Sequence, residues 1–510
     1  MRPAGAARGG QSAGPCDDRS RRLGSGRVNT PSPAPSHPDA GSSPAAGHTL
    51  ARSLGHGQMA MIAMGSALGT GLFLGSGEAI GYAGPAVIVA FAVGSLIAAT
   101  IALAMGEMAS RHPVRGGFGT LAARYLSPFW GYLSRWLYWI VTVAVTGAEL
   151  VACAAYLAYW FPAVPIWAGI LLFAAVIVGI NLATVGSFGV IEFALSSIKV
   201  VAVLVFILIG LFLVLFGMPG ESAPGLSLLT SDGGFAPNGW GAVWIALSVV
   251  MFSFGGIELL SITAAEAKDP ARSIRTAART AIVRLAFFYV LCIGIVVSLV
   301  PWQEAAGNRE DVATSPFVMV FDRIGVPGAA SITNLLVLVA ALSAANANLY
   351  AGSRMLHSLA SDGLAPRVFA RTTRRHVPYV GIVASSVGLL AAAILAFSGV
   401  GGVFGYMMSL VVFAVLLVWF LILATFVAYR RRGVEGATFR VPGGVVTAVV
   451  GMVGLLTVLS TVFVRESMQI AAAVGVPAVL LATLLYFIVV RRRLDTAAIE
   501  EAFDEAESMR

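Results

Sequence analysis

The sequence predicts an all-α polytopic membrane protein with twelve transmembrane helices, arranged as a five-plus-five inverted repeat with broken helices 1 and 6. Hydrophobic residues make up 58% of the chain and charged residues 11%, whereas a soluble domain carries roughly 25% charged residues. The mean hydropathy is +0.85. Apolar runs of about 20 residues, the length that crosses a bilayer, lie near residues 60–82, 85–109, 129–160, 166–184, 191–217, 241–265, 281–300, 329–358, 379–398, 402–428, 445–465 and 469–490.

The first run contains a cluster of glycines at mid-membrane depth, which indicates a broken helix around Gly69, Thr70 and Gly71. Each glycine costs a helix interior about 1 kcal/mol relative to alanine. Unwound backbone inside a membrane is tolerated only within protein or beside a cavity. The N–H groups of Thr70 and Gly71, at the start of a half-helix near Leu72, would favour a carboxylate. Close helix packing through Gly71 and Gly75 remains an alternative.

The sixth run carries a second interruption, at Gly255 and the glycine that follows it. Interrupted helices at corresponding positions of two halves point to the binding site of an inverted-repeat transporter. Runs 1–5 and 6–10 are therefore the predicted repeats, with runs 11 and 12 appended. We expect carbonyl groups near Ala67, Phe252 and Gly255 to accept a substrate's amine, Phe252 and Phe254 to supply an apolar lining, and Glu258 to orient or gate the site.

Three ionisable residues deep inside the predicted spans are functional candidates. Lys199 is about eight residues into the fifth run, hence roughly 12 Å along its axis, so it needs a partner or must exchange a proton. Glu149 lies in the middle of the third run, and Glu258 follows the second break. Lys199, Glu149 and Glu258 are the predicted proton-coupling residues, with purely structural roles left open for each.

Amide and hydroxyl groups gather on the eighth run, where Asn346, together with Ser343 and Asn348, is expected to line the site. Glu107 is close to Arg111 near the end of the second run. We predict a surface ion pair between these two residues.

The distribution of arginine and lysine predicts the orientation in the membrane. Connections after even-numbered runs carry most of these residues, whereas the opposite connections carry only Arg309 and Arg323. Because cytoplasmic loops are enriched in Lys and Arg, both termini are predicted to be cytoplasmic in a multi-pass protein of the cell membrane. Residues 1–55 are poor in large apolar side chains and are predicted to be a disordered arm. Residues 56–490 form the predicted transmembrane domain, and 491–510 a cytoplasmic tail.

An ordered set of short motifs resembles the bacterial amino acid transporter family of the amino acid/polyamine/organocation superfamily. The motifs are Met64–Phe73, Gly84-Pro85, Gly106–Met108, Phe254–Glu258, Glu266–Pro270 and Ser315–Phe317. The resemblance extends from about Gly57 into the twelfth run. It implies a five-plus-five inverted repeat and proton-coupled uptake of amino acids.

Two positions depart from this pattern. Many members of the family have lysine where this chain has Glu78, and serine where it has Ala347. Within the family, Arg354–His357 and Phe439–Val445 look most like proline-specific permeases.

The expected function is therefore secondary active import of an amino acid with a proton, with proline first among small neutral substrates. Permeases for 4-aminobutyrate, aromatic or cationic amino acids, and an amino acid sensor, are the alternatives. A channel is disfavoured because filters are built from rings of repeated elements. The sequence contains no His-Glu-x-x-His run, and its three cysteines are far apart, so we expect neither an enzyme nor a metal or other cofactor. Nucleic acid is not an expected partner, and the oligomeric state is open.

Overall fold

The computed structural model describes residues 55–217, 223–267, 270–307, 315–323, 328–398, 403–434, 436–437, 439–494 and 496–508. The predicted disordered arm lies outside the described residues, except for Gly55. The all-α prediction is confirmed, since no strand occurs in these ranges. Eight helical segments in them are long and apolar enough to cross a membrane, and three shorter apolar helices accompany these.

Every predicted span corresponds to a helix or to an interrupted series of helices. In chain order they are α1 (His56–Ala67), α2 (Thr70–Phe73) and α3 (Gly75–Ala83); α4 (Val87–Arg111); α6 (Pro128–Ala158); α7 (Ile166–Leu182); α8 (Val185–Phe216); α9 (Trp240–Ser253) and α10 (Leu259–Thr263); α11 (Pro270–Leu299); α14 (Ala329–Ser361); α15 (Tyr379–Phe397); α16 (Val403–Arg431); α17 (Val445–Leu459); and α18 (Glu466–Leu485).

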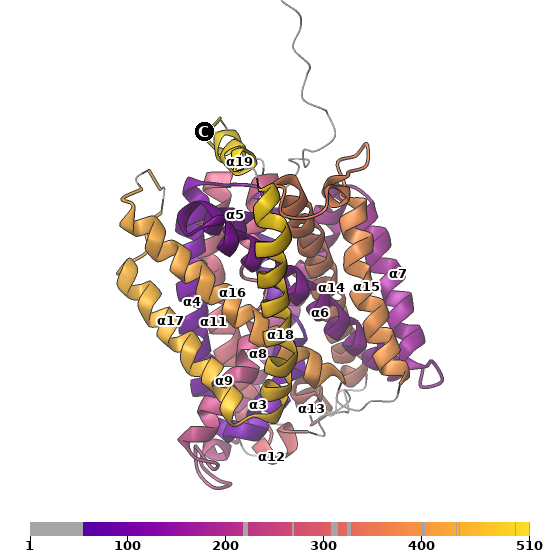
Figure 1. The fold of residues 1–510 in the computed structure, drawn as a ribbon. Helices are drawn as coiled ribbons and strands as arrows, with labels where there is room; N and C mark the ends of the chain where they lie inside the picture. Colours follow the sequence, from indigo (N-terminus) through magenta and orange to yellow (C-terminus); the bar gives the residue numbers. More distant parts are fainter. Residues whose placement is uncertain are drawn as a thin grey trace, which may run out of the picture. The chain divides into compact units, whose positions relative to one another are not determined.

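Short helices lie between and after the spans. They are α5 (Gly117–Tyr125), α12 (Trp302–Ala305), α13 (Pro316–Arg323), α19 (Ala497–Ser508), the 3₁₀ turns η1 (Gly84–Ala86), η2 (Ser227–Leu229), η3 (Ala264–Glu266), η5 (Arg367–Ala370), η6 (Ser460–Phe463) and η8 (Arg491–Arg493), and the π turn η7 (Tyr486–Val490). Figure 1 shows α5 and α19 at one end of the helix bundle and α12 at the other. We call these ends the α5 face and the α12 face.

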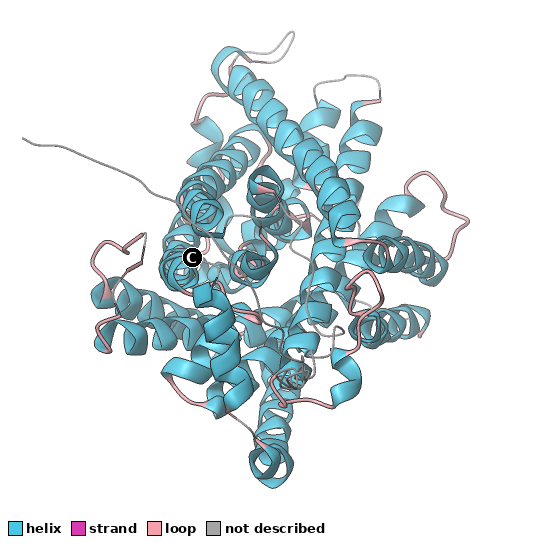
Figure 2. Ribbon diagram, turned by 90° about the horizontal axis from the view of Figure 1, so that it is seen from above, coloured by secondary structure: helices cyan, strands magenta, loops and turns pink. Residues whose placement is uncertain are grey.

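Corresponding spans of the two sets of five pack against each other. The pairs are α3 with α9, α4 with α11, α6 with α14, and α7 with α15. Figure 1 shows α7 and α15 side by side, and Figure 2 shows the bundle from above. This pairing brings the two broken spans together, and every residue of α2 is buried.

The two helices outside the repeat pack on one part of it. Helix α17 contacts α4 and α16, and α18 contacts α16. Apolar side chains of α18 such as Val474 and Leu480 are more than half exposed. A bilayer is the environment that such a surface requires, because it exposes many large apolar side chains.

The C-terminal segment contains a helix that packs on the α5 face. In α19, Phe503 is buried and its ring lies 5.1 Å from that of His112. Glu507 and Glu500 pair with Arg111 at 3.4 Å and with Arg124 at 3.5 Å. The residues predicted to form a tail therefore include an amphipathic helix with specific contacts.

Candidate substrate site

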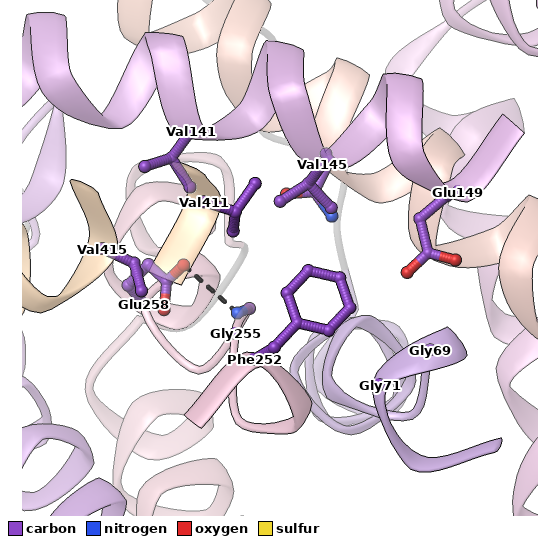
Figure 3. A pocket seen from close by; sticks show the side chains of 12 residues that line it. Gly69, Gly71, Val141, Val145, Glu149, Phe252, Gly255, Glu258, Val411 and Val415 are labelled. Atoms are coloured by element: carbon purple, nitrogen blue, oxygen red, sulfur yellow. Dashed lines mark hydrogen bonds between the residues drawn. The ribbon is translucent and has the colours of Figure 1, made fainter. Parts of the chain in front are cut away.

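The two predicted breaks meet around one small cavity (Figure 3). Its volume is about 20 Å³, enough for about one water molecule. Both breaks contribute to its lining, as do α6, α14 and α16. The lining residues are Gly69, Gly71, Val141, Val145, Glu149, Phe252, Gly255, Gly256, Glu258, Asn348, Val411 and Val415.

The first break is a short extended segment that only a small residue fits. Gly69 has φ −108° and ψ −160° and immediately precedes α2. A Cβ atom on Gly69 would lie 2.7 Å from Oε1 of Glu149, and one on Gly71 would lie 2.7 Å from Cα of Ser253. The backbones of α2 and α9 thus approach too closely for a side chain at position 71.

The second break is a turn of five residues between α9 and α10 that depends on glycine. Gly256 has φ +99°, in the left-handed region. Its N–H donates to Oε1 of Glu258 at 3.1 Å, the dashed line in Figure 3. The second carboxyl oxygen, Oε2, accepts from Nε1 of Trp419 at 3.1 Å, and Trp419 is fully buried in α16. Glu258 therefore fastens the second break to α16.

A carboxyl group of the protein already occupies the N-terminal end of α2. Oε1 of Glu149 accepts a hydrogen bond from the N–H of Thr70 at 3.3 Å. Oε2 of Glu149 and the hydroxyl of Thr70 are buried, and neither has a hydrogen-bond partner among the described residues. This N–H, expected from the sequence to hold a substrate's carboxylate, is thus bonded to Glu149.

Four residues expected at the site are not among the residues that line the cavity: Thr70, Phe254, Ser343 and Asn346. Phe254 faces α11, and its ring makes an edge contact with Tyr289 at 4.8 Å. Asn346 donates to Glu192 at 3.0 Å and accepts from Asn181 at 2.8 Å, whereas the neighbouring Asn348 does line the cavity. Ala67 is the last residue of α1, and its side chain lies outside the described part of the structure. Rotation of each helix about its axis decides which of two nearby residues faces the cavity.

Lys199 is deeper in its helix than the sequence indicated, because α8 begins at Val185 rather than at residue 191. The hydroxyl of Thr184 accepts from the N–H of Ser187 at 3.1 Å and caps this earlier start. Lys199 is buried outside the cavity lining, and its Nζ donates to the carbonyl of Gly65 in the last turn of α1. It therefore ties α8 to the helix end beside the first break.

Glu192 is a buried carboxylate that sequence reasoning missed. It accepts hydrogen bonds from Ser196 at 3.1 Å, from Ser343, and from Asn346 at 3.0 Å. A glutamate flanked by apolar residues in a membrane span is by itself an indication of a functional group. Because residue 192 lies at the edge of the predicted run 191–217, the sequence alone does not mark it as an intramembrane group.

The prediction that Glu107 forms a surface pair with Arg111 is wrong. Glu107 is buried and accepts from Arg430 at 2.7 Å and from the N–H of Val441 at 2.6 Å. Arg111 instead reaches Glu507 of α19. The partner of Glu107 is more than three hundred residues away in the chain, so local spacing gave the wrong pair.

Two buried ion pairs join helices of the bundle. Arg354 of α14 pairs with Glu266 at 3.1 Å, and Arg135 of α6 pairs with Asp362 at 2.5 Å. Both pairs connect segments that are distant in the chain.

Comparisons with known proteins agree with this architecture. A family model described as amino acid permease matches residues 58–499. The chain is 38% identical over 383 residues to an uncharacterized amino acid permease of Bacillus subtilis, covering 75% of this chain and 82% of the relative. It is 38% identical over 397 residues to an aromatic amino acid transport protein of Salmonella typhimurium, covering 78% and 86%. It is 34% identical over 443 residues to a probable threonine/serine transporter of Bacillus subtilis, covering 86% and 95%.

These relatives are permeases or transport proteins by description, not enzymes. The matched region contains both breaks, the cavity and the spans that surround them. The chain therefore belongs to the amino acid permease family and is a multi-pass membrane protein that transports amino acids.

Proposed function

We propose that this permease imports a small neutral amino acid together with a proton, and that the cavity between the two breaks is the substrate site. The meeting of two unwound segments at one cavity lined mostly by buried residues is the observation that carries the proposal. Such segments offer backbone N–H and carbonyl groups to a zwitterion in surroundings that exclude water. A transporter needs such a site near the middle of its helix bundle.

The backbone N–H and carbonyl groups at the two breaks suit the carboxylate and amine of a free amino acid. The substrate's carboxylate would accept from the N–H groups of Thr70 and Gly71, and its amine would donate to carbonyls near Ala67, Phe252 and Gly255. The side chain would then lie among valines and the ring of Phe252. Figure 3 shows this ring between α6 and the Gly69–Gly71 segment, so its movement would enlarge the cavity.

Proline is the first substrate to test. Its pyrrolidine ring is apolar, as the valine lining is, and its secondary ammonium still offers two donors to carbonyls. Discrimination among apolar side chains is modest, roughly 10- to 200-fold per methylene, so several neutral substrates would share the site. An aromatic amino acid is the second candidate, because one relative carries that description.

Glu149 is the favoured site of the coupled proton. The bound substrate's carboxylate would compete with Glu149 for the N–H of Thr70. Two adjacent carboxylates are not both ionised at low cost, so substrate binding would favour a protonated Glu149. Lys199 would act differently, by holding the end of α1 through Gly65. Glu258 is the third candidate, although both of its oxygens already accept hydrogen bonds.

We further propose that the α5 face is cytoplasmic and that both termini lie on that side of the cell membrane. Arg111, Arg115 and Arg124 lie on or next to α5, and Arg430 lies in the last turn of α16 and pairs with Glu107 of α4. This concentration of arginines at the α5 face agrees with the rule that cytoplasmic segments of membrane proteins are enriched in Lys and Arg.

Uptake of labelled amino acids into proteoliposomes tests the proposal. The panel contains proline, alanine, serine, phenylalanine, 4-aminobutyrate and lysine, each with and without an imposed inward proton gradient. We expect saturable uptake of proline that the gradient drives to accumulation. Accumulation of lysine alone would overturn the substrate assignment, whereas uptake indifferent to the gradient would overturn the coupling. Binding without uptake of any substrate would favour a sensor.

A further inference from the structure

A buried arginine joins both broken spans on the α12 face. Arg465 lies in the connection between η6 and α18, and its side chain is 3% exposed. Its Nη2 donates to Oε1 of Glu78 in α3 at 2.6 Å, and its Nη1 donates to the hydroxyl of Ser248 in α9 at 3.0 Å. The guanidinium also lies 5.7 Å from the ring centre of Tyr82. One side chain thus contacts the α12-face halves of both interrupted helices.

The connection that carries Arg465 is itself held in place. The N–H of Arg465 donates to the carbonyl of Thr461 at 2.9 Å, and its own carbonyl accepts from the N–H of Met468 at 3.0 Å. Nearby, Nε1 of Trp244 in α9 donates to the carbonyl of Thr457 at 2.7 Å. The α17–α18 hairpin therefore provides a fixed base from which Arg465 reaches both spans.

We propose that Arg465 is a positioning residue for transport, a latch that ties α3 and α9 to the α17–α18 hairpin and stabilises the state in which the cavity is closed toward the α12 face. The inference rests on the proposed function and on that face being external. Opening there requires α3 and α9 to move away from the hairpin. That movement breaks a charge-assisted bond in a poorly hydrated place, where such bonds are strongest.

The latch assigns a role to two features that the substrate site leaves unexplained. Helices α17 and α18 lie outside the predicted repeat, yet through Arg465 they contact its moving parts. Glu78 is the acidic partner of Arg465, and a lysine at position 78 would face Arg465 with a like charge. The acidic residue at position 78 and the arginine at 465 therefore act as a pair.

Accessibility of a cysteine in the cavity tests the latch without depending on substrate. The background is the full-length protein with Cys16→Ser, Cys153→Ala and Cys292→Ala, and the reporter is Val415→Cys, since Val415 is buried in the cavity lining. A membrane-impermeant maleimide is applied to vesicles of known orientation. With Arg465→Gln we expect labelling from the α12 face to be about tenfold faster, which corresponds to about 1.4 kcal/mol, and labelling from the α5 face to be slower.

The matched control is Glu466→Gln, which removes a charge from the adjacent, exposed residue and is expected to leave both rates unchanged. Glu78→Gln breaks the same pair from its more exposed side and should reproduce Arg465→Gln. The charge exchange Glu78→Arg with Arg465→Glu should restore slow labelling, although each change alone accelerates it.

Faster labelling of Arg465→Gln from both faces would mean that the substitution merely loosens the protein, and this result would overturn the proposal. Rates equal to those of Glu466→Gln, or a charge exchange that labels as fast as its single variants, would overturn it too. If the latch variants behave as expected while the wild-type protein takes up no amino acid, the latch stands and the proposed function fails.

Discussion

Adding a methyl group at position 71 is the most direct test of the proposed substrate site. Gly71→Ala would place a Cβ atom 2.7 Å from Cα of Ser253 and 2.9 Å from Cδ1 of Phe252. The nearest atom belongs to the backbone, so no flexible side chain can move aside to make room. The helices α2 and α9 must therefore separate. Overpacking of this kind costs typically 1–3 kcal/mol. If the cost falls on the state that encloses the substrate, affinity falls by about 5- to 150-fold.

Gly75→Ala is the matched control. It lies one turn further along the same broken span, and its Cβ atom would meet Sδ of Met408 at an ordinary 3.6 Å. Equilibrium binding of labelled proline to the purified protein, followed by uptake in proteoliposomes, measures both variants. We expect Gly75→Ala to bind like the wild type and Gly71→Leu to bind nothing. If Gly71→Ala binds as tightly as Gly75→Ala, the approach of α2 to α9 is not part of the substrate site.

Three further perturbations separate the candidate proton carriers and test the N-terminal arm. Glu149→Gln imitates a protonated carboxyl, so we expect substrate binding that no longer strengthens as the pH falls; an unchanged pH dependence in binding titrations would exclude Glu149. Lys199→Ala removes the bond to Gly65, and we expect it to keep binding and counterflow between equal pools but to lose gradient-driven accumulation. Accumulation with wild-type dependence on external pH would make Lys199 structural. Deletion of residues 1–50 should leave uptake kinetics intact, and a large loss in protein that still reaches the membrane would contradict the prediction of a disordered, dispensable arm.

The amino-acid sequence alone determined the helices, the two breaks and the general position of the cavity between them. Membrane spans follow from local composition, because each must present about 20 apolar residues to lipid. The breaks also follow from local sequence, because clustered glycines raise the free energy of a helix wherever that helix packs. Gly69, Gly71, Gly255 and Glu258 were therefore expected from the sequence, and they line the cavity. The same local signals placed the start of the fifth span at residue 191, six residues after the true start of α8 at Val185. The predicted depth of Lys199 in its helix was therefore too small.

Only the tertiary structure decided which side chains meet. Asn348 lines the cavity and Asn346 does not, because successive residues of a helix point in directions about 100° apart and packing sets the rotation of the whole helix. Long-range pairs were equally beyond the sequence. Glu149 bonds to Thr70 across 79 residues, and Arg465 bonds to Glu78 across 387. Such contacts depend on the distance between helices after folding, and no local spacing in the chain records that distance.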